Sequence, residues 1–225
     1  MRTSKQISQN KKKICSFVAD GECEFWYLQM LRNSENVRIA VSPEMYQKKS
    51  MDEQYNKVVS YAEDSEKVFW IIDFDVILKE TRECKKGKEP ALAKFNKYAE
   101  KLKDKKYANV EIVVNNPCLE FWFLLHFCQT VKYFESYDKL LPDLKKQTTL
   151  SNYEKTEKYF TTGTDIYKRL KPYLETAIEN AGKCGKFNFE QTSKGISEMN
   201  KIFENLGLTE KSSKSNPNLP TTIRV

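Results

Sequence analysis

Two short acidic clusters stand out because each one directly follows an apolar stretch. The stretch VFWII is followed by Asp73 and Asp75, which are separated by one phenylalanine. Nearer the N-terminus, the run ICSFVA is followed by Asp20, Glu22 and Glu24. Carboxylate oxygens are ligands that Mg²⁺ and Mn²⁺ prefer, and such ions often contact a substrate phosphate as well. The two clusters therefore predict metal-assisted phosphate chemistry, provided that the fold brings them together.

The spacing of Asp73 and Asp75 allows two interpretations. If both residues are extended, their side chains point to the same side of the strand and lie about 6.6 Å apart along the chain, close enough to share a divalent cation. Burying such a pair is unfavourable unless a cation or hydrogen bonds compensate for it. In the alternative interpretation, the two aspartates cap the next turn or pair with Lys79 and Arg82.

Strand and helix patterns alternate through the first half of the chain. A capping-box pattern, Ser50 with Glu53, precedes one of the helical segments. Strand patterns occupy residues 14–19, 37–41, 68–75 and 110–114, and helical periodicity lies between them at residues 22–33, 51–62 and 91–102. This order predicts an α/β fold with a mostly parallel four-stranded sheet flanked by helices. Ligands bind at the carboxyl ends of strands in such sheets, and the acidic clusters are expected there.

The second half of the chain is expected to be all-helical. Residues 118–127 form a helical segment that is apolar enough to be buried, and Pro172 should break a later helix. Helical periodicity continues at residues 137–146, 153–160, 165–181 and 196–206. The predicted organisation is a basic tail at 1–13, an α/β core at 14–128, a helical region packed on it at 129–208, and a disordered tail at 209–225.

The net charge of +7 does not define a phosphate-binding face. Residues 1–13 contribute +5 and residues 209–225 contribute +2, so the body between them is neutral overall. The six cysteines are scattered, with one histidine in the chain, and this favours free thiols over a zinc site. The seven glycines form no phosphate-binding loop of the usual kinds. Neither a membrane-spanning run nor a secretory signal is evident, so a cytoplasmic protein without membrane contact is expected.

Two metal-dependent families end an apolar strand with the pattern Asp-x-Asp. The haloacid-dehalogenase-like phosphatases resemble the stretch DFDVIL, but their motif lies on the first strand and Ile77 stands where Thr or Val is usual. In the Toprim fold, an acidic residue follows the first strand and Asp-x-Asp follows the third. The order of elements here matches the Toprim pattern.

Three longer blocks resemble a more specific family. DGECEFWYLQML, VFWIIDFDVIL and VNNPCLEFWFLLHF are similar to the signature blocks of RloB-like proteins, a Toprim-related bacterial family encoded with restriction and anti-phage defence systems. The resemblance covers residues 14–127 and extends more loosely to residue 206. It implies a Toprim-like sheet and metal-dependent cleavage of nucleic acid, either DNA or RNA.

The resemblance also assigns roles to the acidic residues. Asp73 and Asp75 would be the metal-binding pair, with Mg²⁺ or Mn²⁺ as the cofactor. Asp20 stands where the family has a glutamate, and it reaches less far towards a metal. Glu24, four residues later on the same helical face, is therefore a second candidate for the same role. Glu22 is expected only to favour the positive end of its helix.

The third block adds Glu120 and His126 as further catalytic candidates. On a helix, six residues of separation place these two side chains on different faces, and a histidine beside aromatic residues is commonly a packed one. Asn115 and Asn116 are expected on the same rim as the aspartates, where they could orient Glu120 or a phosphate. Alternatively, Asn116 is a helix N-cap.

The second half contains a set of aromatic and basic residues that could stack bases and hold phosphates. The set comprises Tyr153, Tyr159 and Tyr167 with the substrate-binding candidates Lys155, Lys158, Lys168 and Arg169.

Three functional hypotheses follow. The first is a Mg²⁺-dependent or Mn²⁺-dependent nuclease of a prokaryotic anti-phage or restriction-associated defence system, acting on nucleic acid. The second is a non-catalytic Toprim-like module that senses or binds nucleic acid or a protein of the same operon, because Asp20 departs from the family pattern. A dehalogenase-like phosphatase ranks third. A homo-oligomer is left open.

Overall fold

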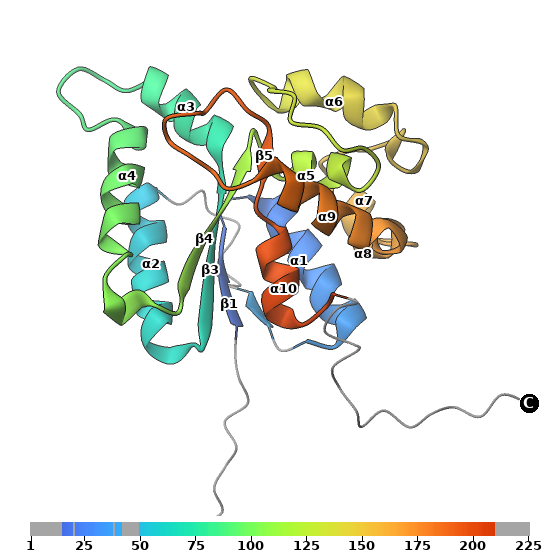
Figure 1. Ribbon diagram of the computed structural model, residues 1–225, viewed down its shortest axis with the longest axis horizontal. Coiled ribbons are helices and arrows are strands. Elements are labelled where there is room, and N and C mark those ends of the chain that lie inside the picture. Colours follow the sequence, from blue (N-terminus) through green and yellow to red (C-terminus); the bar gives the residue numbers. More distant parts are fainter. Residues whose placement is uncertain (1–14, 20, 38, 42–49, 210–225) are drawn as a thin grey trace, which may run out of the picture.

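A single mixed sheet organises the computed structural model, which describes residues 15–19, 21–37, 39–41 and 50–209 (Figure 1). Within these residues the strands run in the order β2-β1-β3-β4-β5. The first four are mutually parallel, and β5 pairs antiparallel with β4. The strands are β1 (Cys15–Val18), β2 (Ile39–Val41), β3 (Lys67–Asp73), β4 (Val110–Asn116) and β5 (Ile196–Ser197). The predicted α/β class with a mostly parallel sheet is confirmed.

Helices cover both faces of the sheet, and Figure 1 shows α2 and α4 on one side with α1, α5, α9 and α10 on the other. The helices are α1 (Glu22–Glu35), α2 (Met51–Asp64), α3 (Phe74–Arg82), α4 (Ala91–Lys101), α5 (Leu119–Leu125), α6 (Tyr137–Lys145), α7 (Glu157–Thr161), α8 (Ile166–Leu170), α9 (Leu174–Cys184) and α10 (Asn200–Leu206). Short 3-10 turns lie at Lys105–Tyr107, Thr148–Leu150 and Lys171–Tyr173. The predicted break near Pro172 lies at the last of these turns.

Alternate residues of the central strands enter two separate hydrophobic clusters. Phe69 and Ile71 of β3 belong to the cluster shared with α1 and the helices of the second half. Trp70 and Ile72 belong to the cluster shared with α2, α3 and α4. Successive side chains of a strand point to opposite faces, so a strand covered on both faces is apolar throughout. This explains the uninterrupted run VFWII.

The larger cluster takes residues from both sides of residue 128, the predicted boundary between core and helical region. Trp122 of α5 stacks on Phe203 of α10, with ring centroids 5.4 Å apart. Tyr27 of α1 lies 5.9 Å from Tyr167 of α8 by the same measure. The helical second half therefore packs directly against α1 and α5. The predicted tails, residues 1–13 and all but the first residue of 209–225, lie outside the described residues.

The third strand ends earlier than predicted. β3 stops at Asp73, and α3 starts at the next residue, Phe74. Because Asp75 lies in the first turn of α3, the condition that both aspartates are extended is not met. The predicted strand included Phe74 and Asp75, whereas both residues belong to α3, which buries Phe74 and Ile77.

The second half is not entirely helical, because β5 forms a short fifth strand. Asn115 pairs with Ser197 and Asn116 with Ile196.

A capping box at the start of α2 is present as predicted: the Ser50 side chain accepts from the Glu53 N–H, and the Glu53 carboxylate accepts from the Ser50 N–H.

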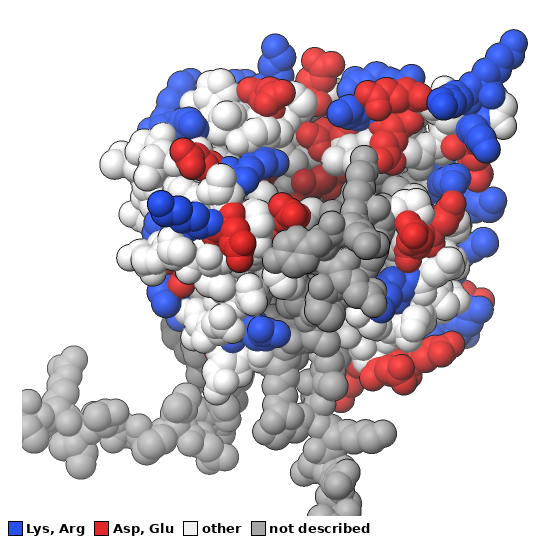
Figure 2. Space-filling view, turned by 180° about the vertical axis from the view of Figure 1, so that it is seen from behind, with Lys and Arg blue, Asp and Glu red and all other residues white. Residues whose placement is uncertain are grey.

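Charges of both signs are interspersed on the face shown in Figure 2, with several acidic side chains close together in the upper middle of the view. This mixture agrees with the neutral charge expected for the body of the chain.

Among the described helices, none combines the length and the hydropathy that a bilayer crossing requires.

Gly195 and Gly182 form a matched pair for testing how tightly β5 is packed. A Cβ on Gly195 would lie 2.4 Å from the Lys132 carbonyl oxygen and 2.6 Å from the Phe121 ring, whereas a Cβ on Gly182 meets nothing within 4 Å. We expect Gly195→Ala to destabilise the protein by about 2 kcal/mol or more. Gly182→Ala, within α9, should be neutral or stabilising by up to about 1 kcal/mol. Urea unfolding of both variants checks this, and equal stabilities would contradict it.

Candidate functional site

Four carboxylates meet at the carboxyl ends of the parallel strands. Asp73 is the last residue of β3, and Asp75 lies in the first turn of α3. Glu24 lies in the first turn of α1, which follows β1, and Glu120 lies in the first turn of α5, which follows β4. Their charges act on one another: Glu24, Glu120 and Asp75 each raise the pKa of Asp73. The fold thus brings together acidic residues from both predicted clusters and from the third block.

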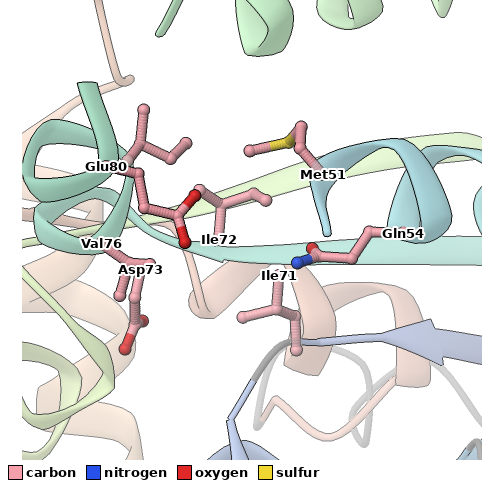
Figure 3. Close-up of a pocket in the computed structure, with 8 residues that line it drawn as sticks. Met51, Gln54, Ile71, Ile72, Asp73, Val76 and Glu80 are labelled. Atoms are coloured by element: carbon pink, nitrogen blue, oxygen red, sulfur yellow. The ribbon is translucent and has the colours of Figure 1, made fainter. Parts of the chain in front are cut away.

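The direction of the Asp73 side chain follows from the strand alternation. Asp73 follows Phe69 and Ile71 in the same alternation, so its side chain belongs to the face covered by α1 and α5. In the close-up of Figure 3, the Asp73 carboxylate points away from Gln54 and Glu80. The small cavity drawn there, about 20 Å³, has room for about one water and lies on the side of Met51. It is not the space in which the carboxylates meet.

Backbone hydrogen bonds hold Asp75 in position. Its N–H donates to the Pro117 carbonyl at 3.0 Å, which ties the start of α3 to the loop between β4 and α5. Its carboxylate oxygen Oδ2 accepts from the Tyr137 N–H at 3.2 Å, at the start of α6. Desolvation raises the pKa of Asp75, and the bond from Tyr137 opposes this shift. The second half of the chain therefore helps to place a residue of the first half.

Glu24 is 5% exposed, and its carboxylate folds back over Gly21. A Cβ at position 21 would lie 2.0 Å from Glu24 Oε2, so glycine provides the space that the carboxylate occupies. Burial and the nearby Glu120 raise the pKa of Glu24 to about 7, against the opposing effects of a backbone hydrogen bond and of Lys155. Glu24 can therefore gain or lose a proton near neutral pH.

Glu120 is fully buried and is bound by two residues of the segment between α6 and α7. Its Oε1 accepts from the Tyr153 hydroxyl at 2.5 Å and lies 3.1 Å from Lys155 Nζ. Lys155 Nζ also lies 3.8 Å from the centre of the Tyr137 ring. Burial by itself would lower the pKa of Lys155, but Glu120 holds it above the usual value. Among the described residues, the site therefore contains one ammonium group and four carboxyl groups.

Two carboxylate oxygens in the site are buried without a hydrogen-bond partner: Asp73 Oδ1 and Glu120 Oε2. Desolvation, followed by the charges of Glu24 and Glu120, raises the pKa of Asp73 well above its usual range. Unpaired buried carboxylates are unfavourable, and either a proton or a cation relieves the repulsion between them. The arrangement therefore suits a group that supplies positive charge.

The predicted metal set of Asp20, Glu24, Asp73 and Asp75 is not fully described. Asp20 lies outside the described residues. Across residues 15–19, 21–37, 39–41 and 50–209, no three Asp, Glu, His or Cys side chains form a group that could hold a metal ion as they stand. The donor chemistry nevertheless fits a hard cation, because carboxylate oxygens are its preferred ligands and two of them have no partner.

The two asparagines of β4 support the sheet and do not lie on an open rim. Asn115 is fully buried, and its side-chain oxygen accepts from Ser197 Oγ at 2.7 Å. Asn116 donates to the carbonyls of Thr192 and Lys194 at 2.7 and 2.8 Å. The N-cap of α5 is Cys118, so the alternative interpretation of Asn116 as an N-cap is also wrong. Both asparagines join β4 to the segment around β5.

His126 is a packed histidine, as the alternative interpretation proposed. It is 1% exposed, its Nδ1 lies 2.9 Å from the Trp122 carbonyl, and its ring meets Trp122 edge-on. Burial lowers the pKa of His126 to about 4, so the ring is neutral at physiological pH. Its contacts are with Trp122 and Phe127 and not with the four carboxylates.

The aromatic and basic set of the second half divides into three parts. Tyr153 and Tyr167 are buried and present no face on which a base could stack, and Lys155 enters the carboxylate site. Lys168 pairs with Asp165, the N-cap of its own helix, at 3.1 Å. Lys158 and Arg169 line an open depression together with Tyr159.

Sequence patterns did not identify the partners that hold Glu120 and Asp75. Tyr153 was interpreted as a base-stacking residue, and nothing indicated Tyr137. No local sequence pattern could have indicated them, because Tyr153 lies 33 residues from Glu120 and Tyr137 lies 62 residues from Asp75 along the chain.

The comparisons place the chain in a known group. A family model described as RloB-like protein matches residues 17–206. The chain belongs to the RloB-like protein family. The match extends from β1 to α10 and includes all four carboxylates of the RloB-like site, which confirms the resemblance seen in the three sequence blocks. The curated proteins and the solved structures compared with this RloB-like chain gave no match.

The raised pKa of Glu24 predicts how stability depends on pH. In the unfolded chain this group loses its proton near its ordinary pKa of 4.5, whereas in the folded protein it keeps the proton up to about pH 7. The contribution of Glu24 to the free energy of unfolding is therefore fully present below about pH 4.5. It is lost as pH rises through 7, a decrease of about 1–3 kcal/mol.

We expect the free energy of unfolding in EDTA to fall between pH 5 and pH 8, and Glu24→Gln to reduce that fall. Glu22→Gln, which changes an exposed residue of the same helix, is the control. Urea unfolding at four pH values checks the prediction. A pH dependence that Glu24→Gln leaves unchanged would show that Glu24 is not the protonated group.

Gly21→Ala tests the position of the Glu24 carboxylate without removing any charge. The new Cβ must displace that carboxylate, which is the far end of a flexible side chain, so we expect a small change in melting temperature. The pKa assigned to Glu24 by NMR titration should shift towards 4.5, because the displaced group becomes more solvated. An unchanged titration would contradict the observed position.

Proposed function

We propose that this RloB-like protein is a nuclease that uses Mg²⁺ or Mn²⁺ to hydrolyse phosphodiester bonds of nucleic acid. The observation that supports this most strongly is the pair of unpartnered oxygens, Asp73 Oδ1 and Glu120 Oε2, within four carboxylates at the carboxyl ends of parallel strands. Open parallel sheets bind their ligands at that edge. Hard oxygen ligands close together favour a divalent cation over other groups.

Asp73, Asp75 and Glu24 are the described residues that would hold the ion, with Asp20 as the further candidate from the sequence. A bound Mg²⁺ would supply an activated water and would neutralise the negative charge on the phosphodiester. Because no three of the described carboxylates form a ready metal group, side-chain rotation must accompany binding. Because the pKa values of Asp73 and Glu24 are both raised, binding of the ion would compete with protons at these two groups.

Other residues of the site have distinct proposed tasks. Glu24, with a pKa of about 7, can supply a carboxylate to the ion near neutral pH. Lys155 supplies a fixed positive charge, and the Tyr153 hydroxyl keeps Glu120 in place beside it. His126 is left out of the reaction, since it is buried, neutral and bound to Trp122.

The order of acidic residues and strands also supports this class. One acidic cluster follows β1 and the Asp-x-Asp pair follows β3, which is the pattern of the Toprim fold. RloB-like proteins are encoded with restriction and anti-phage defence systems, so we propose a role in such a system in the cytoplasm. A protein of the same operon is then the expected partner besides nucleic acid.

Two observations favour a second candidate, a non-catalytic module that binds nucleic acid or a partner protein. The described carboxylates do not form a three-ligand metal group as they stand, and Asp20 replaces the glutamate of the family pattern. A module of this kind would keep the fold and the charge cluster but would not cleave.

Asp73→Asn and Asp75→Asn test the nuclease directly, because each removes a negative charge with little change in shape. We expect the wild-type protein to cleave labelled RNA or DNA with Mg²⁺ or Mn²⁺ but not with EDTA, and each variant to lose at least about 100-fold in rate. Asp104→Asn, which replaces one N-cap residue by another, is the control and should retain full activity.

Two other outcomes have definite meanings. If no nucleic acid is cleaved and neither ion raises the melting temperature, the nuclease proposal is wrong and the non-catalytic module is favoured. Hydrolysis of small phosphate esters that Asp73→Asn abolishes, without cleavage of nucleic acid, would instead indicate the dehalogenase-like phosphatase.

A further inference from the structure

An open depression of about 320 Å³ lies beside the two short helices α7 and α8. It is separate from the space in which the four carboxylates meet. Its lining is polar and comes from a single stretch of the second half of the chain: Asn152, Glu154, Thr156, Lys158, Tyr159, Thr162, Thr164 and Arg169. At this size it could hold one nucleotide but not a duplex.

The charges around the depression favour an anion. Lys158 and Arg169 face a single acidic residue of the lining, Glu154. Lys158 is exposed, and within the described part of the chain no carboxylate forms an ion pair with it. The Thr164 hydroxyl and the Asn152 amide add neutral hydrogen-bonding groups, whereas the hydroxyls of Thr156 and Thr162 already bond backbone groups of α7. This combination of two cations with hydroxyl and amide groups is typical of sites that hold phosphate and sugar.

Arg169 is held in a fixed orientation with part of its guanidinium unused. One terminal nitrogen donates to the Tyr159 carbonyl, and the guanidinium lies 4.0 Å from the centre of the Tyr159 ring. Its Nε is buried and has no hydrogen-bond partner. A guanidinium already fixed on one side loses little freedom when it binds a phosphate with its remaining donors. Its plane is also a surface on which a nucleobase can stack.

A chain of contacts joins this depression to the carboxylate site. The Tyr159 ring meets the Tyr153 ring edge-on, with centroids 5.3 Å apart, and the Tyr153 hydroxyl donates to Glu120. Glu154 and Thr156 line the depression, while Lys155 between them reaches Glu120. One short segment therefore contacts the carboxylates with some of its side chains and lines the depression with others.

We propose that the depression binds one nucleotide of a single-stranded segment of the substrate, next to the bond that the carboxylate site cleaves. Arg169 and Lys158 hold its phosphates, and the hydroxyl and amide groups contact the sugar or the base. The inference rests on the proposed nuclease function and adds the substrate class, a single strand or an unpaired segment.

Fluorescence anisotropy with labelled eight-nucleotide RNA and DNA strands tests this, using the Asp73→Asn protein in EDTA so that binding is measured without cleavage. We expect Lys158→Gln and Arg169→Gln each to weaken binding about 5- to 30-fold and to reduce its salt dependence. Glu154→Gln should strengthen binding a few-fold, because it removes the one negative charge of the lining. Lys183→Gln, an exposed charge on α9, is the control and should change nothing.

Two results would overturn the inference. One is unchanged affinity in both Lys158→Gln and Glu154→Gln, which alter exposed side chains and leave the fold intact even if Arg169→Gln does not. The other is a duplex of the same length binding as tightly as the single strand. A protein that binds in this way but never cleaves would contradict the nuclease proposal alone, and cleavage that is insensitive to Lys158→Gln and Arg169→Gln would contradict this inference alone.

Discussion

Repulsion among four buried or half-buried carboxylates is the constraint on which the site depends. Glu24, Asp73, Asp75 and Glu120 come from three separate strand-to-helix junctions, and each junction alone would be unremarkable. Glu24, Glu120 and Asp75 raise the pKa of Asp73, and among the described residues the ammonium of Lys155 offsets part of the negative charge. Burial, followed by the charge of Glu120, raises the pKa of Glu24 to about 7. A divalent cation could take the place of a proton at this group without any change in the fold.

The helical second half is required to maintain this arrangement. Tyr153 and Lys155 bind Glu120, and the backbone of Tyr137 binds Asp75. The same half supplies about half of the hydrophobic cluster that covers the sheet face towards which Asp73 points. The α/β part therefore provides the acidic residues, and the helical part holds two of them in place and provides the compensating charge.

Sequence patterns predicted the features that depend on local periodicity. Patterns within a few neighbouring residues were enough to predict the four parallel strands, α1, α2 with its capping box, and the break at Pro172. The whole of α3 was missed, since VIL after Asp75 is as typical of a strand as of a helix, and only packing decides between them. β5 was missed because two residues are too short for any periodic signal.

The candidate site was predictable only in part, for a similar reason. Placing acidic residues at strand ends followed from the general geometry of parallel sheets. That geometry does not predict which nearby polar residues belong to the site, because burial decides this. Asn115, Asn116 and His126 have polar side chains near the acidic residues in sequence, yet each is turned into the interior and paired there. Tyr153, distant in sequence, reaches Glu120 through tertiary packing alone.

The two-residue strand β5 has a consequence for chain length. The edge of β4 is completed by residues more than 80 positions later: the Val114 N–H donates to the Glu198 carboxylate, the Val114 carbonyl accepts from the Glu198 N–H, and Asn115 bonds Ser197. A fragment that stops before residue 196 would contain every acidic residue of the site but would leave β4 as an open edge strand. Such edges pair readily with other chains. The minimal stable unit of this fold is therefore set by the end of the helical region and not by the last acidic residue.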